Sequence, residues 1–252
     1  MNKTVLITGA TAGIGEACAH LFAANGYNLI ITGRRDSRLQ KLKETIQLQH
    51  PVAVDTCCFD VQKREDVFTA INQLPGDIKA IDILINNAGL ALGKEPFDEA
   101  DIDDWETMMH TNVDGLLYVS RAVLPLLKQS KQPHIINLAS IAGKEVYENG
   151  NVYCASKYAV DALTKAMRID LLKHGIKVTG IYPGAVETEF SLVRFKGDTD
   201  KAGAAYKGLT ALTAGDIADI IFYCASLPPH VCINELVITC LQQAGTYYFY
   251  KT

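Results

Sequence analysis

A tyrosine, a lysine and a serine in this sequence have the types and spacing of a proton-transfer site. Tyr153 and Lys157 are four residues apart in a stretch with helical periodicity, so both side chains lie on one helix face. A phenol with a pKa of about 10 is a poor base near neutral pH, but a nearby ammonium favours the phenolate. Ser140 follows an apolar run at the point where such a strand would end. The three side chains indicate general acid–base chemistry; a solvated helix surface is the alternative for the Tyr–Lys pair.

Three glycines close to the start of the chain form a second candidate site. Gly9, Gly13 and Gly15 give the pattern TGxxxGxG between the first apolar run and the first helical stretch. Glycine permits a tight turn there and lets backbone N–H groups approach a pyrophosphate at the helix N-terminus. Such a trio also suits a turn that binds nothing, but its position between strand and helix favours a dinucleotide.

The residues after the second apolar run indicate which dinucleotide. A chain that binds NAD usually has an acidic residue there, which accepts hydrogen bonds from the adenine ribose. This chain has Gly33 followed by Arg34 and Arg35, and two guanidinium groups suit a 2′-phosphate. Together with Arg38 and Lys41 they could instead form a solvated helix start. We predict NADP(H) rather than NAD(H).

The elements that would position these groups alternate along the chain. Short apolar runs, continuous rather than alternating in polarity, are typical of strands covered on both faces. They span residues 4–7, 28–32, 52–59, 81–85, 135–138, 178–182 and 236–239, and helical stretches span 13–25, 37–49, 64–74, 103–128, 151–174 and 214–226. Asp36 and Thr213 occupy expected N-cap positions, and Gly26 and Gly175 expected C-terminal positions.

This alternation predicts an α/β fold: a single-domain, Rossmann-type, doubly wound sheet of about seven parallel strands with helices on both faces. The 252 residues contain no repeat or linker, so we expect one domain over 1–252. Residues 186–212 lack clear periodicity, and a stretch of that length in a compact domain favours a lid over the site. We call it the lid segment.

Composition excludes several classes of partner and site. The net charge of -4 gives no attraction to nucleic acid or acidic membranes, and no apolar run is long enough to span a bilayer. No pair of Cys or His has zinc spacing, so we expect no metal. Seven scattered cysteines and an N-terminal run too short for a signal peptide indicate reduced thiols and a cytoplasmic location.

Over nearly its whole length the chain resembles the short-chain dehydrogenase/reductase family. The resemblance rests on TGxxxGxG at 8–15, the Asn86–Gly89 sequence NNAG, Ser140, the Tyr153/Lys157 pair and Pro183-Gly184. It implies that Tyr153 is the general acid/base, that Ser140 binds the same substrate oxygen, that Lys157 holds the nicotinamide ribose and lowers the pKa of Tyr153, and that Asn112 supports a proton relay.

The same resemblance implies a set of cofactor contacts. Asp60 and Val61 would contact adenine, Asn87 would lie beside the adenosine ribose, and Thr188 would meet the nicotinamide carboxamide. The full implied set is Gly9, Thr11, Gly13, Ile14, Gly15, Arg34, Arg35, Asp60, Val61, Asn87, Ala88, Gly89, Tyr153, Lys157, Pro183, Gly184, Val186 and Thr188. Many NADP-preferring relatives have a basic residue where this chain has Ala12, so its phosphate contacts would come from the two arginines and the Thr11 hydroxyl.

Residues 187–198 are similar to a stretch of NADP-dependent 3-hydroxy acid dehydrogenases, a group that includes serine and L-allo-threonine dehydrogenases. A small 3-hydroxy acid needs a cation for its carboxylate, and Arg194 offers one beside Ser140 and Tyr153; a structural role for Arg194 is equally open. The alternatives are a carbonyl or 3-oxoacyl reductase of the same family, or a non-catalytic protein that senses NADP(H). The resemblance also implies a homotetramer or homodimer, to which the aromatic C-terminal residues 247–250 could contribute.

Overall fold

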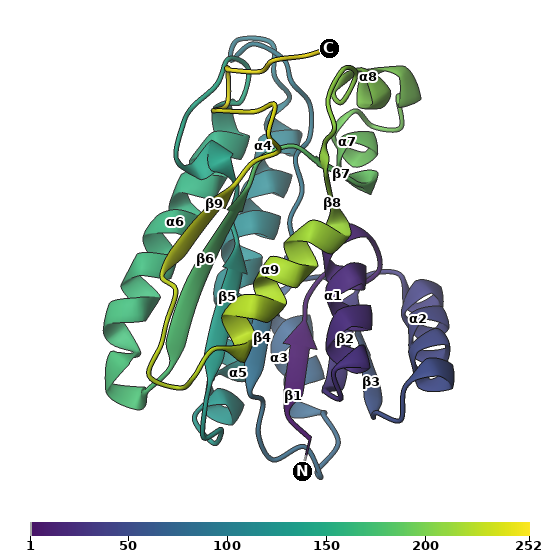
Figure 1. Ribbon diagram of the computed structural model, residues 1–252, viewed down its shortest axis with the longest axis vertical. Coiled ribbons are helices and arrows are strands. Elements are labelled where there is room, and N and C mark those ends of the chain that lie inside the picture. The colour runs from purple at the N-terminus through teal and green to yellow at the C-terminus, as the bar shows by residue number, and fades with distance from the viewer. Residues whose placement is uncertain (1) are drawn as a thin grey trace.

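Seven strands form one parallel sheet in the computed structural model, which describes residues 2–252 (Figure 1). The strands are β1 (Thr4–Ile7), β2 (Asn28–Gly33), β3 (Val54–Cys58), β4 (Ile83–Asn86), β5 (His134–Leu138), β6 (Lys177–Pro183) and β9 (Glu235–Ile238). Their order across the sheet is β3-β2-β1-β4-β5-β6-β9, and each neighbouring pair is parallel. The order reverses direction between β1 and β4, so the predicted doubly wound sheet is confirmed.

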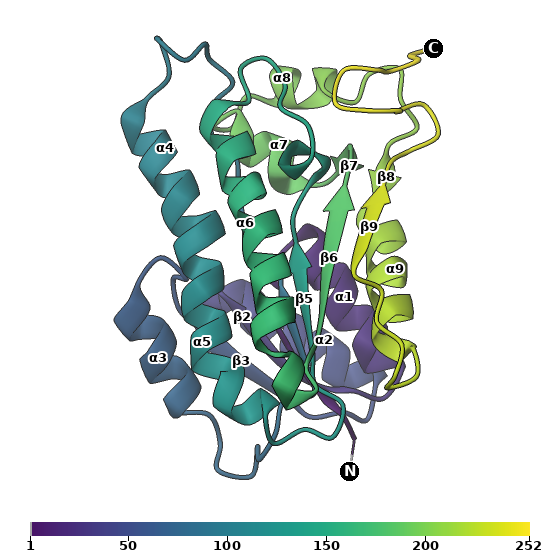
Figure 2. The same ribbon diagram turned by 90° about the vertical axis from the view of Figure 1, so that its left-hand side faces the viewer.

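Helices cover both faces of the sheet because neighbouring residues of a strand point to opposite sides. Val5 and Ile7 pack with one face's helices, α1 (Gly13–Ala24), α2 (Asp36–Gln49) and α9 (Ala214–Ser226). Leu6, between them, packs on the other face, which is covered by α3 (Arg64–Asn72), α4 (Ile102–Met109), α5 (Gly115–Leu127) and α6 (Asn151–Asp170) (Figure 2). Continuous apolar strands therefore fill two cores at once.

The helices differ from the sequence predictions chiefly at their ends. The predicted helix over 103–128 is continuous but contains a π-helical turn, His110–Asp114, between α4 and α5. Asp36 is the first residue of α2 rather than its N-cap, a position that Arg35 occupies without a side-chain cap, so that prediction was wrong by one residue. Thr213 does cap α9, in a reciprocal pair with Asp216. Within residues 2–252, no helix is both long and apolar enough to cross a bilayer.

The lid segment is largely structured. It contains β7 (Val186–Glu187), α7 (Glu189–Arg194), α8 (Thr199–Ala204) and β8 (Leu212–Thr213), and β7 and β8 pair with each other in a small separate sheet. Thr188 caps α7 by accepting a hydrogen bond from the Phe190 N–H, which places the helix directly after the β7 strand. Figure 2 shows α7 and α8 beyond the ends of the β5 and β6 arrows, the edge at which parallel sheets bind ligands.

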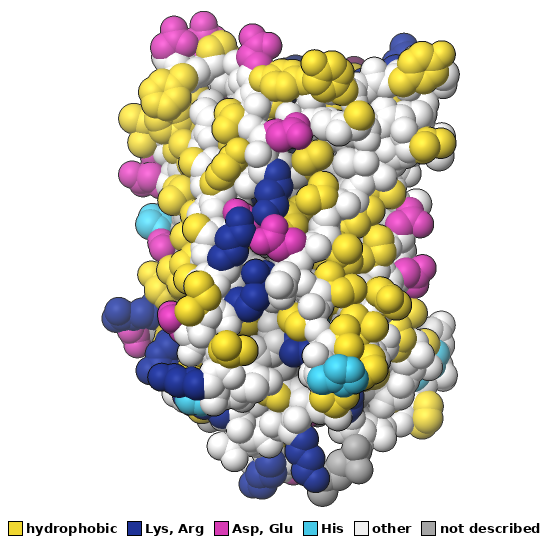
Figure 3. Space-filling model, turned by 60° about the vertical axis from the view of Figure 1, so that its left-hand side comes forward, with side chains coloured by type: hydrophobic (Ala, Val, Ile, Leu, Met, Phe, Trp, Pro, Cys, Tyr) yellow, Lys and Arg dark blue, Asp and Glu magenta, His cyan; other side chains and the backbone are white. Residues whose placement is uncertain are grey.

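A network of ion pairs joins α6 to the edge strand β9. The Tyr182 hydroxyl donates to Asp161 Oδ1 at 2.6 Å, and Lys144 Nζ bridges Asp161 and Glu235 at 2.7 and 2.6 Å. Lys165 Nζ contacts the other Asp161 oxygen at 2.8 Å. Figure 3 shows basic and acidic side chains alternating in a column on this face of the molecule. The network fixes α6, the helix of Tyr153 and Lys157, against the sheet.

Candidate active site

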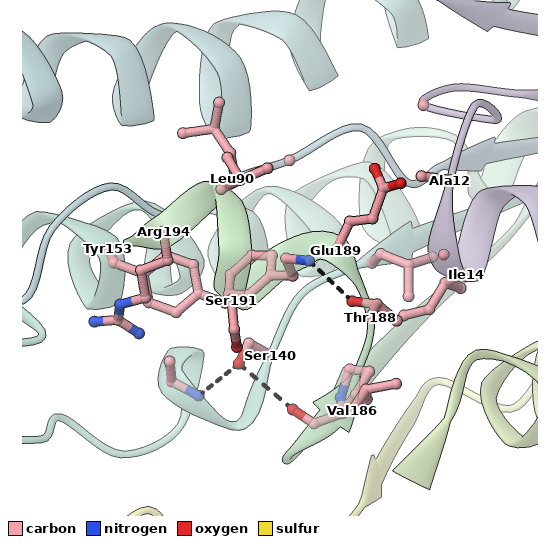
Figure 4. A pocket seen from close by; sticks show the side chains of 18 of the residues that line it. Ala12, Ile14, Leu90, Ser140, Tyr153, Val186, Thr188, Glu189, Ser191 and Arg194 are labelled. Atoms are coloured by element: carbon pink, nitrogen blue, oxygen red, sulfur yellow. Dashed lines mark hydrogen bonds between the residues drawn. The ribbon is translucent and has the colours of Figure 1, made fainter. Parts of the chain in front are cut away.

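A cavity of about 860 Å³ opens at the carboxyl edge of the sheet, beneath the lid segment (Figure 4). A dinucleotide and a small substrate fit a space of this size. Of the residues singled out from the sequence, those that line it are Gly9, Thr11, Gly13, Ile14, Arg34, Arg35, Asp60, Val61, Asn87, Ala88, Gly89, Ser140, Tyr153, Lys157, Pro183, Gly184, Val186, Thr188 and Arg194. Gly15 and Asn112 are not among the lining residues.

The turn from β1 into α1 forms one end of the cavity. Gly9 has φ +65°, a conformation that side chains other than glycine rarely adopt. A Cβ on Gly15 would collide with the Gly9 carbonyl oxygen and with Asn87 Nδ2, so the helix approaches the turn as closely as it can. Ala12, the N-cap of α1, provides no side-chain acceptor for the first backbone N–H groups. Free helix N–H groups at such a turn fit the pyrophosphate of a dinucleotide.

Asn87 holds the glycine turn in place. Its Nδ2 donates to the carbonyl oxygens of Thr8 and Gly9 at 2.9 and 3.1 Å, and the Thr8 hydroxyl accepts from the N–H groups of Asn87 and Ala88. These bonds tie the end of β4 to the end of β1. The side chain that the family resemblance places beside the ribose therefore also shapes the backbone around it.

The two arginines after β2 differ in their surroundings. Arg34 lies 3.6 Å from Asp60 and is largely exposed. Arg35 is more tightly fixed: its Nε and Nη2 donate to the Thr11 hydroxyl at 3.2 and 2.8 Å, and its Nη1 donates to Glu189 Oε2 at 3.2 Å. Arg35 and Thr11 are therefore hydrogen-bonded to each other at the cavity, and their contact with a phosphate stays a prediction.

Two further residues belong to this cluster but were not identified as site residues from the sequence. Arg38 Nη1 donates to both oxygens of Glu189, at 2.9 and 3.0 Å. The signal for Arg38 was its position three residues after Arg35, on the same helix face. Glu189 lies about 150 residues away in the lid segment, and only the folded chain brings it to the arginines.

Tyr153 is buried, and its environment favours the neutral phenol. Burial raises the pKa of Tyr153 well above its usual value, and Tyr147 acts in the same direction. A hydrogen bond with Ser140 and the positive charge of Arg194 act in the opposite direction but do not offset burial. Lys157 Nζ lies 5.9 Å from the centre of the Tyr153 ring. Burial therefore dominates the pKa of Tyr153, and the expected lowering of that pKa by Lys157 stays a prediction.

Ser140 and Lys157 are both fixed by backbone groups. Ser140 Oγ accepts from the Ala142 N–H at 3.1 Å and lies 3.4 Å from the Pro183 carbonyl oxygen. Lys157 Nζ donates to the Leu138 carbonyl oxygen at 3.0 Å, and burial lowers the pKa of Lys157 to about 8. A buried lysine with a readily removed proton, next to a buried phenol and a hydroxyl, can take part in moving a proton.

Asn112 lies in the π-helical turn and has its hydrogen-bonding groups paired. Its carboxamide oxygen accepts from the Leu90 N–H at 2.8 Å, and its nitrogen donates to the Leu90 carbonyl oxygen and to Ser156 Oγ at 2.8 and 3.0 Å. A Cβ on Gly89 would lie 3.2 Å from Asn112 Oδ1 and 3.5 Å from Lys157 Nζ. Asn112 therefore packs directly behind the wall that Gly89 and Lys157 form.

Arg194 connects the lid segment to the cavity. Its Nε donates to the Gly93 carbonyl oxygen at 3.0 Å and its Nη1 to the Tyr147 hydroxyl at 2.9 Å. The guanidinium carbon lies 5.5 Å from the centre of the Tyr153 ring. Among the partners that residues 2–252 offer, none bonds to Nη2. Arg194 anchors the lid segment and also presents charge beside Tyr153, so the two alternatives left open by the sequence are compatible.

No metal centre accompanies these groups in the part of the chain that the structure describes, since three His, Cys, Asp or Glu side chains do not gather anywhere in it. The side chains described above offer a phenol, a hydroxyl and an amine beside the cavity.

Comparison with known proteins places this arrangement in a family. The family model described as short chain dehydrogenase matches residues 3–197. The NADP-dependent 3-hydroxy acid dehydrogenase YdfG of Salmonella typhi is 48% identical over 233 residues, 92% of each chain, and a sulfoacetaldehyde reductase of Chromohalobacter salexigens is 46% identical over 97% of this chain and 96% of its own. The closed form of a serine dehydrogenase complexed with NADP+ superposes with a TM-score of 0.91 at 42% identity, covering 99% of both chains. The resemblance predicted from the sequence is confirmed: the chain belongs to the short-chain dehydrogenase family and is an oxidoreductase.

Proposed function

We propose that the protein catalyses reversible hydride transfer between NADP(H) and the hydroxyl or carbonyl group of a small 3-hydroxy acid such as L-serine, L-allo-threonine or 3-hydroxyisobutyrate. The observation that carries the proposal is the position of Arg194. Its guanidinium lies 5.5 Å from the Tyr153 ring with one nitrogen free of partners among the described residues. In a 3-hydroxy acid, the carbon that bears the hydroxyl group is two bonds from the carboxylate carbon. A carboxylate bound by Arg194 would therefore bring that carbon towards the Tyr153 hydroxyl.

The cofactor is NADP(H), which supplies or accepts the hydride when bound. The glycine turn and the N-terminus of α1 would hold its pyrophosphate, Asp60 and Val61 its adenine, and Thr188 its carboxamide. Arg34 and Arg35 would recognise the 2′-phosphate, since they directly follow β2 and Thr11 fixes Arg35 at the cavity. The NADP dependence of the relatives named above supports this assignment.

The chain's own residues would manage the proton. In reduction, Tyr153 donates its proton to the oxygen of the carbonyl group, which Ser140 holds by a hydrogen bond. Because burial raises the pKa of Tyr153, the phenol is neutral near pH 7 and suited to this step. In oxidation, the positive charge of Lys157 stabilises the phenolate that removes the hydroxyl proton. Asn112 fixes the Leu90 backbone behind Lys157 and would support the path by which the proton leaves.

A sulfonate aldehyde is a second candidate substrate. Two sulfoacetaldehyde reductases of Chromohalobacter salexigens are 44 and 46% identical to the chain over 97% of its length. A guanidinium group binds a sulfonate through the same paired hydrogen bonds that it offers a carboxylate. A carbonyl or 3-oxoacyl reductase whose substrate has no such anion would leave the charge of Arg194 without a role. A protein that only senses NADP(H) would leave Tyr153 without a role.

The test is an assay panel with NADP+ or NADPH and, in parallel, the cofactors that lack the 2′-phosphate. The substrates are L-serine, L-allo-threonine, 3-hydroxyisobutyrate, sulfoacetaldehyde, a 3-oxoacyl thioester and uncharged alcohols and ketones of similar size. Arg194→Met should lower kcat/KM for the charged substrates about 10- to 100-fold, the loss expected for a charge-assisted hydrogen bond. It should change kcat/KM for the uncharged substrates far less.

A matched control is Lys196→Met, which also removes a lid cation. Lys196 contacts Asp104 at 2.8 Å and does not line the cavity. If both variants reduced activity equally on charged and uncharged substrates, Arg194 would be a lid anchor only. Equal activity with both forms of the nucleotide would contradict the proposed phosphate contact.

We also propose a homotetramer or homodimer. Exposed apolar side chains, Leu117 on α5 and Tyr158 and Ile169 on α6, offer a surface to a second copy. Light scattering that gives the mass of one chain would contradict this. The cytoplasmic location expected from the sequence stays a prediction, which fractionation of the source cell would check.

A further inference from the structure

Glu189 reaches from the lid segment to the arginines at the adenine end of the cavity. It is the first residue of α7, and its carboxylate accepts from Arg35 Nη1 at 3.2 Å and from Arg38 Nη1 at 2.9 and 3.0 Å. Figure 4 shows its side chain directed away from Tyr153, towards the Ala12 end of the cavity. The two guanidinium groups hold the pKa of Glu189 below its usual value, so the group is a carboxylate at neutral pH.

The carboxylate takes the donors that a phosphate would need. Arg35 has Nε and Nη2 directed at the Thr11 hydroxyl, which leaves Nη1 for an anion, and Glu189 occupies it. Arg38 likewise has its Nη1 on Glu189, with only a long contact of 3.5 Å to the Thr11 carbonyl oxygen besides. Arginine donors in this fork geometry bind carboxylate and phosphate groups in the same way.

We infer that Glu189 is a nucleotide-specificity residue, whose carboxylate competes with the 2′-phosphate of NADP(H) for Arg35 and Arg38. This rests on the proposed function, in which Arg35 recognises that phosphate. Glu189 lowers the affinity of the protein for NADP(H), and it thereby reduces the difference in affinity between NADP(H) and NAD(H). Glu189 is also the first residue of α7, the helix that ends at Arg194. A phosphate that displaces the Glu189 carboxylate therefore also frees the first turn of α7 from the arginines.

Binding of adenine-half fragments isolates this effect from the nicotinamide and from catalysis. The probes are 2′,5′-ADP, which carries the 2′-phosphate, and 5′-AMP, which lacks it, titrated calorimetrically into wild type and Glu189→Gln. The variant should bind 2′,5′-ADP about 3- to 5-fold more tightly, the effect of removing partly exposed ion pairs worth up to about 1 kcal/mol. Its affinity for 5′-AMP should stay within about twofold, and the gain should diminish at high salt.

Glu187→Gln is the matched control. Glu187 precedes Glu189 by two residues, makes no ion pair among residues 2–252 and does not line the cavity, so its neutralisation should leave both affinities unchanged. Unchanged or weaker binding of 2′,5′-ADP by Glu189→Gln would overturn the inference.

The variant Arg35→Met distinguishes a failure of the inference about Glu189 from a failure of the proposed function. If that variant weakens 2′,5′-ADP and spares 5′-AMP, the phosphate contact stands whatever Glu189 does. If it affects neither ligand, the phosphate contact itself is refuted, and the role of Glu189 with it.

Discussion

Replacing Lys157 by methionine should make the folded protein more stable while removing activity. The lysine is buried, its ammonium has one hydrogen bond within the described residues, to the Leu138 carbonyl oxygen, and burial lowers its pKa to about 8. Methionine has a similar unbranched side chain and carries no charge, so it can fill the same space. The cost of holding a buried charge would then disappear.

The magnitude follows from the pKa. A lysine in the unfolded chain has a pKa of about 10.5, and one pKa unit corresponds to about 1.4 kcal/mol, so charging Lys157 costs about 3 kcal/mol more in the folded protein. Loss of the Leu138 hydrogen bond offsets about 1 kcal/mol of this. Lys157→Met should therefore raise the free energy of unfolding by about 2 kcal/mol at pH 7.

The dependence on pH gives the sharper test. Because the pKa of Lys157 is lower in the folded protein, the unfolded chain binds more protons between about pH 8 and 10.5, and wild-type stability contains a term that rises with pH in that window. Below pH 8 the penalty is fully present. The advantage of Lys157→Met should therefore be constant up to about pH 8 and then shrink.

Urea unfolding of both proteins, without nucleotide, from pH 7 to pH 10 measures this directly. Lys165→Met, on the same helix, is the control: that lysine is half exposed and paired with Asp161, so its removal should bring no gain. A Lys157→Met protein less stable than wild type at pH 7, or a gain unaffected by pH, would refute the reasoning.

Three further outcomes are expected. Tyr153→Phe should reduce kcat by about 10² to 10⁴, the usual contribution of a general acid, with NADPH affinity by fluorescence titration within about twofold; near-normal turnover would remove Tyr153 from its role. Asp161→Asn should lower the free energy of unfolding by about 2 kcal/mol at pH 7, because ion pairs and hydrogen bonds hold the Asp161 pKa at about 2. Since that pKa is lowered, the contribution is present above about pH 4 and is lost towards pH 2, so the two proteins should converge in acid. Gly15→Ala should lower the Tm and weaken NADP+ binding, because its Cβ would meet the Gly9 carbonyl oxygen and Asn87; an unchanged Tm and affinity would contradict the close approach.

Much of the fold could be predicted because its strands are continuous apolar runs. Val5, Leu6 and Ile7 are all fully buried, and that burial on both faces is what the run in the sequence indicated. The glycine turn could be predicted in part for a similar reason, since the conformation of Gly9 is a local requirement, whereas the close approach at Gly15 also involves Asn87 at the end of β4. Requirements that depend on nearby residues can be recognised in the sequence.

The features that escaped prediction depend on the tertiary structure. The sequence shows that Lys157 lies one turn from Tyr153, but not that both are buried deeply enough for burial to govern the pKa of the phenol. It shows three arginines near the second strand, but not that Glu189, far along the chain, meets two of them. Desolvation and long-range ion pairs follow from packing, which no spacing rule encodes.

The π-helical turn at His110–Asp114 confines the effect of a one-residue change of length to the turn itself. Such a turn accommodates one residue more than regular helical winding requires. Deleting one residue there would restore ordinary winding with α4 and α5 keeping nearly the same facing, because the wide turn absorbs the extra residue without rotating the helix on either side. Asp104, which contacts Lys196, and Trp105, which donates to Asn151, would therefore still face the lid segment and α6. The effect of such a deletion would fall on Asn112, which lies in the turn itself and makes its hydrogen bonds to Leu90 and Ser156 from there.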